Sequence, residues 1–149
     1  GTRFPLFFAL IASAIGLASL LNSRLVLRFG MRLLVRRALL LIMLLSLAAL
    51  GLAALTAGKP PLWLLLTYIM TTFFCVGILF GNLNSLAMEP LGAIAGIGAA
   101  IVGSLSTLIS TLLGTLIGQS YNETIFPMVL GLAILAGASM FVVNWANAT

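Results

Sequence analysis

Charged residues are scarce in this chain, and their positions divide it into five long charge-free windows. Seven basic and two acidic side chains, 6% of 149 residues, leave residues 4–23, 38–58, 60–88, 90–122 and 124–149 without a charge. A soluble domain has about 25% charged residues, which cover the surface that faces water. The composition therefore excludes a soluble globular protein and indicates a membrane protein.

Each window is long enough to cross a bilayer once as a helix. The hydrocarbon core, about 30 Å thick, needs about 20 apolar residues at a rise of about 1.5 Å per residue. Prolines are tolerated where a helix begins, and all five lie near the start of a window: Pro5, Pro60, Pro61, Pro90 and Pro127. We predict an all-α, polytopic membrane protein, a single domain over residues 1–149. Its five transmembrane helices are expected at about 4–21, 35–57, 62–85, 94–120 and 125–146.

A cluster of arginines between the first two spans predicts the orientation. Basic residues are enriched in cytoplasmic loops, and this loop contains five: Arg24, Arg28, Arg32, Arg36 and Arg37. The opposite face would receive only Arg3 and Lys59. We therefore expect a plasma-membrane protein with its N-terminus outside and its C-terminus cytoplasmic. The net charge of +5 then reflects topology and lipid headgroups, so nucleic acid is not expected as a partner.

The third span carries polar side chains at helical spacing. Side chains of this kind at membrane depth normally face other helices or a water-filled cavity. We predict that they share one face, which the family resemblance described below would make the wall of a substrate path: Tyr68, Thr71, Thr72, Cys75 and Asn82. The alternative for Asn82 is a hydrogen bond between helices that holds the bundle together.

The fourth span keeps one face small. Glycines let two helix backbones approach closely, so close helix packing is predicted for Gly92, Gly96, Gly103, Gly114 and Gly118. A second stripe bears hydroxyls, which either bond their own helix backbone or line a polar path: Ser104, Thr107, Thr111 and Thr115. The second and fifth spans are rich in Leu and Ala and are predicted to be peripheral.

Several kinds of chemistry have no residues to perform them. Histidine and aspartate are absent, and one cysteine is present. Metal, haem and triad chemistry need such groups in clusters, so we expect no enzyme, no metal site and no cofactor. No predicted span contains the carboxylate that a proton pump usually places within the membrane.

Two stretches resemble a known family. Residues 21–37 resemble the basic cytoplasmic loop of major facilitator superfamily transporters, whose R-x-G-x-[RK] core is matched by Arg28, Gly30 and Arg32, with Arg24 preceding it. Residues 81–119 are similar to the Bcr/CflA-type multidrug-efflux subfamily. There an asparagine is followed by an acidic-proline turn and A-G-x-x-[AS], matched here by Asn82, Glu89, Pro90, Ala95, Gly96 and Ala99.

The resemblance implies helices eight to twelve of a twelve-helix carrier. The chain would be the C-terminal part of a proton-coupled multidrug antiporter of the bacterial inner membrane, completed by an N-terminal half. It would export xenobiotics by alternating access, with a small apolar or cationic drug-like molecule as substrate. The arginine motif would join a cytoplasmic latch between the halves. An odd number of spans and the lack of an initiator Met also led us to expect part of a longer chain.

Two alternatives remain open from the residues alone. One is a small stand-alone membrane scaffold or assembly subunit that packs against a partner through its glycine-rich fourth helix. The other is a pore-forming oligomer, which is less favoured because the fourth span offers only hydroxyls as a polar stripe.

Overall fold

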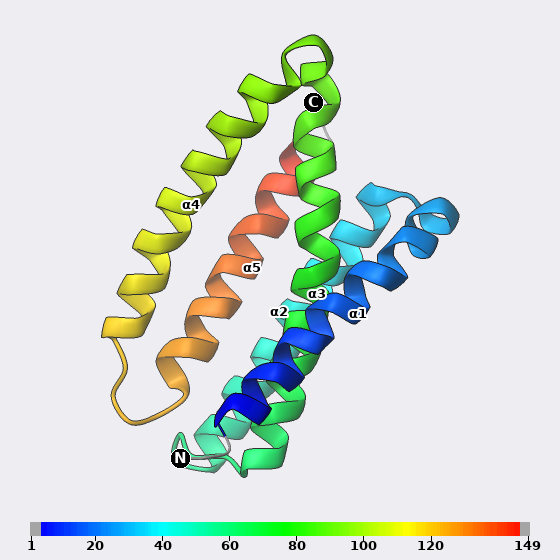
Figure 1. Cartoon of the computed structure of the whole chain (residues 1–149). Helices are drawn as coiled ribbons and strands as arrows, with labels where there is room; N and C mark the ends of the chain where they lie inside the picture. The colour runs from blue at the N-terminus through cyan, green and yellow to red at the C-terminus, as the bar shows by residue number, and fades with distance from the viewer. Residues whose placement is uncertain (1–3, 147–149) are drawn as a thin grey trace.

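The structure, a computed structural model that describes residues 4–146, consists of α-helices joined by short turns (Figure 1). Within that range no residue is in a strand, so the predicted all-α class is confirmed. The elements are α1 (Phe4–Phe29), α2 (Met31–Leu55), α3 (Leu62–Met88), the short 3-10 helix η1 (Glu89–Ile94), α4 (Ala95–Gln119) and α5 (Phe126–Ala146).

Four helical stretches are long and apolar enough to cross a membrane. They are Pro5–Phe29, Met31–Leu55, Leu62–Gln119 and Phe126–Ala146. The third is 58 residues long and includes α3, η1 and α4. It is not straight, because Gly92 has non-helical backbone angles and the chain turns back at η1 (Figure 1). The chain is therefore a multi-pass membrane protein by helix length and composition.

The loop expected between the first two spans is reduced to one residue. α1 continues to Phe29 and α2 begins at Met31, with Gly30 between them at φ 77°. Positive φ values are accessible to glycine at little cost. The prediction of a loop was wrong because apolar residues within it, among them Leu25 and Val26, pack against the core and extend the helix. Arginine is also a good helix former.

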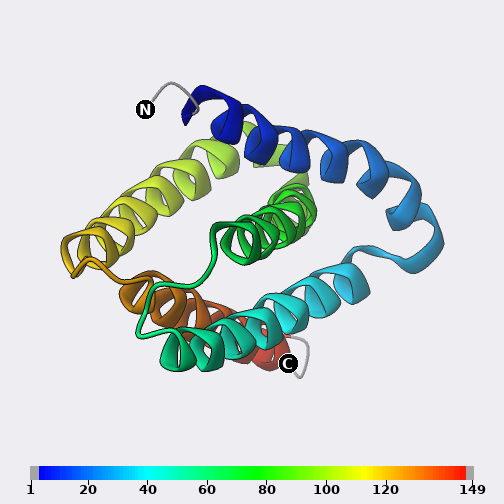
Figure 2. The same ribbon diagram turned by 90° about the horizontal axis from the view of Figure 1, so that it is seen from below.

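α3 lies at the centre of the bundle. Seen from below, α1, α4, α5 and α2 surround it (Figure 2). α1 and α2 pack against α3, and α5 packs mainly against α2. The main core joins α1, α2, α3 and α5 through Ala18, Val35, Cys75 and Ala136, among others.

The burial of α2 and α4 is the reverse of what the sequence predicted. α2 was expected at the periphery, yet it buries eight residues, which lie on one face: Leu34, Val35, Ala38, Leu39, Ile42, Ser46, Ala49 and Ala53. α4 was expected to pack closely, yet only Gly98 is buried. The apolar composition of α2 suits a helix core and lipid equally well, so composition could not distinguish the two.

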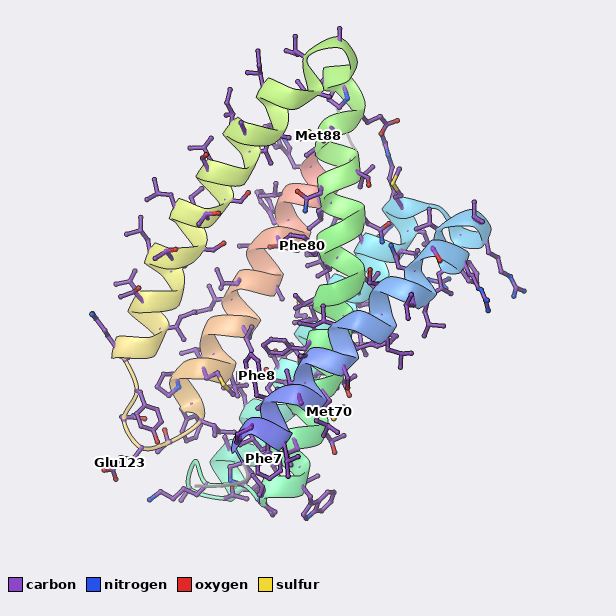
Figure 3. The ribbon with its side chains drawn as sticks, in the orientation of Figure 1. Phe7, Phe8, Met70, Phe80, Met88 and Glu123 are labelled. Atoms are coloured by element: carbon purple, nitrogen blue, oxygen red, sulfur yellow. The ribbon has the colours of Figure 1, made fainter. Side chains whose placement is uncertain are left out.

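The turn after α3 and the loop before α5 lie at opposite ends of the bundle (Figure 1). Met88, at the end of α3, and Glu123, in the loop before α5, lie at opposite ends (Figure 3). At the Glu123 end, the α2–α3 turn contacts the α4–α5 loop, where the Ile125 N–H donates to the Gly58 carbonyl at 3.1 Å. Gly58 has φ +78°, and a Cβ there would lie 2.6 Å from Thr124 Cβ. Only glycine fits this contact.

Candidate functional site

The polar face predicted on α3 exists, but other helices cover it. Tyr68, Thr72, Cys75 and Asn82 are 8%, 1%, 2% and 1% exposed. Thr71 lies at the edge of this face, partly exposed, and its hydroxyl donates to the Thr67 carbonyl of its own helix at 2.8 Å. Within the described residues this face does not line an open path, because α1 and α2 close it.

Asn82 pairs with an asparagine of α1. Its Nδ2 donates to Asn22 Oδ1 at 2.8 Å and to the Ile78 carbonyl at 2.9 Å. Asn22 Nδ2 returns a weaker bond to Asn82 Oδ1 at 3.4 Å. The geometry is that of the alternative considered for Asn82, a hydrogen bond between helices. Sequence reasoning missed Asn22 because it lies just past the predicted end of the first span.

Tyr68 forms a second polar link, to α2. Its hydroxyl lies 3.1 Å from Ser46 Oγ, and both residues are buried. One turn along α3, Thr72 Oγ1 is buried and has no hydrogen-bond partner among residues 4–146. Asn82 and Tyr68 therefore link α3 to α1 and α2, whereas Thr72 adds no hydrogen bond to this interface.

A close glycine contact between α1 and α3 lies at Gly77 of α3. A Cβ at Gly77 would lie 2.8 Å from Ala18 Cβ and 3.0 Å from the Ile15 carbonyl oxygen of α1. One turn later, a Cβ at Gly81 would lie 3.6 Å from Asn22 Nδ2. Gly77 and Gly81 form a G-x-x-x-G pair. The sequence contains this pair, but the prediction of close packing rested on the more numerous glycines of the next span.

The five glycines predicted to pack have open space around them. A Cβ would meet no atom within 4 Å at any of Gly92, Gly96, Gly103, Gly114 and Gly118. Close packing through these glycines is thus absent within the described part of the chain. α4 touches its neighbours elsewhere: Gly98 lies against Leu91 of η1, and Ile117 lies against Gly131 of α5.

The open face of α4 forms a shallow groove of about 650 Å³. Small and hydroxyl-bearing residues line most of it: Ala99, Ala100, Gly103, Ser104, Thr107, Leu108 and Thr111. Thr107 and Thr111 donate to the carbonyls of Gly103 and Thr107 at 2.8 Å. Their protons are therefore satisfied by the helix itself, while their oxygens can still accept. The groove can hold an apolar or cationic group but contains no acid or base.

The predicted arginine motif lies at the α1–α2 turn. Gly30 supplies the turn, and the guanidinium of Arg28 lies 5.4 Å from the centre of the Phe29 ring. Arg37 lies 5.9 Å from the same ring, within range of a cation–π contact. Arg24 and Arg28 occupy the last turns of α1 and Arg32 the first turn of α2. The motif therefore concentrates positive charge at one end of the bundle.

Comparison of this chain with protein-family models, with curated proteins and with solved structures gives no match.

Proposed function

We propose that this chain is a transmembrane transport module, the C-terminal part of a proton-coupled multidrug efflux carrier of the major facilitator type. In this proposal α3 and α4 cross the membrane separately, on either side of η1, to give five spans. The observation that carries it is the uncovered face of α4, where small and hydroxyl residues form a groove along a helix with one buried residue.

An uncovered face of this kind suits the wall of a transport cavity. A hydroxyl group that faces lipid finds no hydrogen-bond partner there. In a cavity shared with the N-terminal half of a carrier, the hydroxyl oxygens can accept from a cationic substrate. We place the substrate path on the α4 groove, at Ser104, Thr107 and Thr111. The α3 face, with Tyr68 and Asn82, becomes the interface that keeps α1, α2 and α3 together as α4 opens or closes the cavity.

The charge distribution supports the proposed orientation. The five arginines of the α1–α2 turn lie at one end, and Lys59 follows α2 at the other. Under the positive-inside tendency, this proposal has the α1–α2 turn and the C-terminal end of α5 on the cytoplasmic side. Arg28, Gly30 and Arg32 would contact the N-terminal half as a latch.

A second candidate is a scaffold or assembly subunit. The open space at Gly103 and Gly114 favours it, because small residues allow another helix to approach the backbone closely. In that case a partner helix, and not a substrate, covers α4.

Cysteine labelling in native membranes distinguishes the two candidates. Cys75 is replaced by Ala, and single cysteines are introduced at Ser104 or Thr111 in the groove. With about 3.6 residues per turn, Ile109 and Leu113 lie on the opposite side of α4, exposed and outside the groove lining, and provide matched controls. Transport predicts that a membrane-impermeant thiol reagent labels the groove positions faster than the controls and that tetraphenylphosphonium protects them.

The scaffold candidate predicts slow aqueous labelling at the groove and disulfide cross-links from Ser104→Cys to a second polypeptide. Equal labelling of both faces, without protection, would contradict transport. An antibody to residues 21–37 adds an independent test in the source cells. A band well above the 15.6 kDa of this chain fits a carrier, and a band at that mass fits the scaffold.

A further inference from the structure

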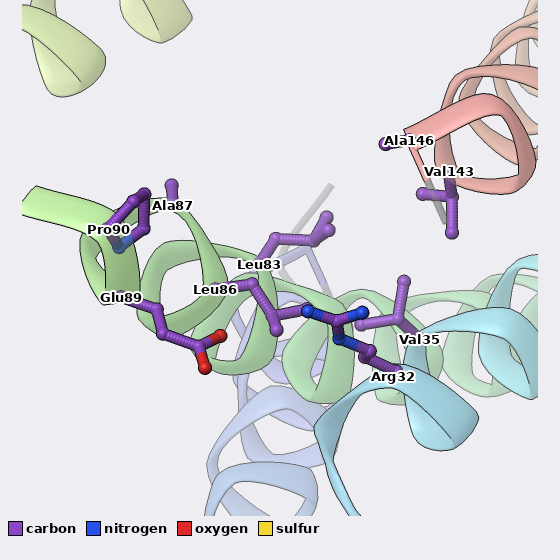
Figure 4. Close-up of a pocket in the computed structure, with 9 residues that line it drawn as sticks. All are labelled: Arg32, Val35, Leu83, Leu86, Ala87, Glu89, Pro90, Val143 and Ala146. Carbon is purple, nitrogen blue, oxygen red and sulfur yellow. The ribbon is translucent and has the colours of Figure 1, made fainter. Parts of the chain in front are cut away.

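A cavity of about 690 Å³ lies between α2, α3, η1 and α5, away from the α4 groove. Its apolar wall includes Val35 of α2, Leu83 and Leu86 of α3 and Val143 of α5 (Figure 4). Such a volume is within the range of about 300–1,000 Å³ that is typical of ligand pockets. The transport proposal does not use this cavity.

The cavity has two charged residues of opposite sign. Arg32 reaches it from α2, and Glu89 reaches it from η1 on the opposite side (Figure 4). A simple anion would be repelled by Glu89, and a simple cation by Arg32. The charge pattern therefore fits a ligand that carries both a negative and a positive group.

The position of the cavity fits the membrane interface. It is lined by residues at the start of α2, the end of α3 and the end of α5. The arginines of the α1–α2 turn lie at the same end and attract phosphate groups to it. The apolar wall of the cavity lies next to this charged pair and offers a surface for an acyl chain.

We propose that this cavity binds a bilayer phospholipid whose headgroup combines a phosphate with a primary ammonium, the phosphatidylethanolamine class. Arg32 contacts the phosphate, Glu89 accepts hydrogen bonds from the ammonium, and one acyl chain lies along Val35, Leu83 and Val143. The inference rests on membrane insertion of the chain and not on transport, so it stands or falls separately from the proposed function.

The site is tested by native mass spectrometry. The full chain in detergent micelles is incubated with defined lipids and then released from the micelles in the spectrometer. Phosphatidylethanolamine, phosphatidylcholine and phosphatidylglycerol with identical acyl chains are compared at equal concentration. We expect the ethanolamine lipid to be retained about tenfold more than the choline lipid, equivalent to about 1.4 kcal/mol. The trimethylated headgroup has the same charge but no N–H to donate to Glu89.

Three variants and one control assign the contacts. Glu89→Gln should remove the preference for ethanolamine over choline, and Arg32→Gln should lower retention of all three lipids. Ala87→Phe should fill the cavity and exclude an acyl chain. Arg36→Gln, one turn from Arg32 on α2 and outside the cavity lining, should bind like the unchanged chain. Equal unfolding midpoints of the variants confirm that they are folded.

Three results would overturn the proposal. Retention that is indifferent to Glu89→Gln and Arg32→Gln would show that the lipid binds elsewhere. A preference of the unchanged chain for phosphatidylglycerol would indicate an anion site. Displacement of all three lipids from the unchanged chain by tetraphenylphosphonium would make the cavity part of a drug path.

Discussion

α3 and α4 are consecutive helices of similar length and composition, yet one is enclosed and the other is open. Both are apolar and combine glycines with hydroxyl side chains at helical spacing. α3 buries seven residues, whereas α4 buries one. The difference lies in the neighbours: α1 presents Ala18 and Asn22 where α3 presents Gly77 and Asn82. A small polar stripe therefore becomes an interface only where another helix complements it.

The strongest test of this comparison is a leucine at one glycine of each helix. Gly77→Leu should destabilise the chain by about 3 kcal/mol, because its side chain would overlap Ala18 and the backbone of Ile15. Gly103→Leu should change stability by no more than about 1 kcal/mol, since nothing lies within 4 Å. The measurement is reversible unfolding in mixed micelles, followed by helical circular dichroism. Equal losses for the two variants would show that α4 is also packed.

The amide pair should have the next largest effect. Asn82→Leu removes both bonds to Asn22 and should cost about 1–2 kcal/mol, as polar contacts between membrane helices do. A double-mutant cycle with Asn22→Leu isolates the pair, and we expect a coupling of about 1 kcal/mol. Strictly additive losses would mean that the two amides do not interact in the membrane.

The tyrosine link should contribute less. Tyr68→Phe removes one hydrogen bond of 3.1 Å to Ser46 and should cost about 0.6 kcal/mol. Ser46→Ala in the Tyr68→Phe background should add little more, because the bond is already absent. A clear further loss in the double variant would assign Ser46 a separate role in packing.

The smallest effect is expected on the open helix. Thr107→Val replaces a hydroxyl that bonds its own backbone at Gly103, so stability should change by less than about 0.5 kcal/mol. Under the proposed function the same variant should nonetheless weaken protection of Thr111→Cys by tetraphenylphosphonium. A marked loss of stability would place Thr107 in an interface and favour the scaffold candidate.

The sequence predicted much of the local structure and little of the packing. The third span was predicted at 62–85 and is observed at Leu62–Met88. Its polar residues share a face, except Thr71. Thr71 directly precedes Thr72 in the chain and therefore points about a quarter of a turn away from it. The partners Asn22 and Ser46 could not be identified, because no local pattern indicates which distant helix will meet a given face.

What the sequence determined by itself is the all-helical, multi-pass character of the chain. A charge-free apolar stretch of about 20 residues satisfies its backbone internally and gains from burial in hydrocarbon whatever its neighbours are. Only the tertiary structure decided which faces are covered. The Asn22–Asn82 contact joins residues 60 positions apart, and Gly77 is buried because α1 crosses it closely. Such contacts depend on the complementary shape of two helices, which neither helix specifies alone.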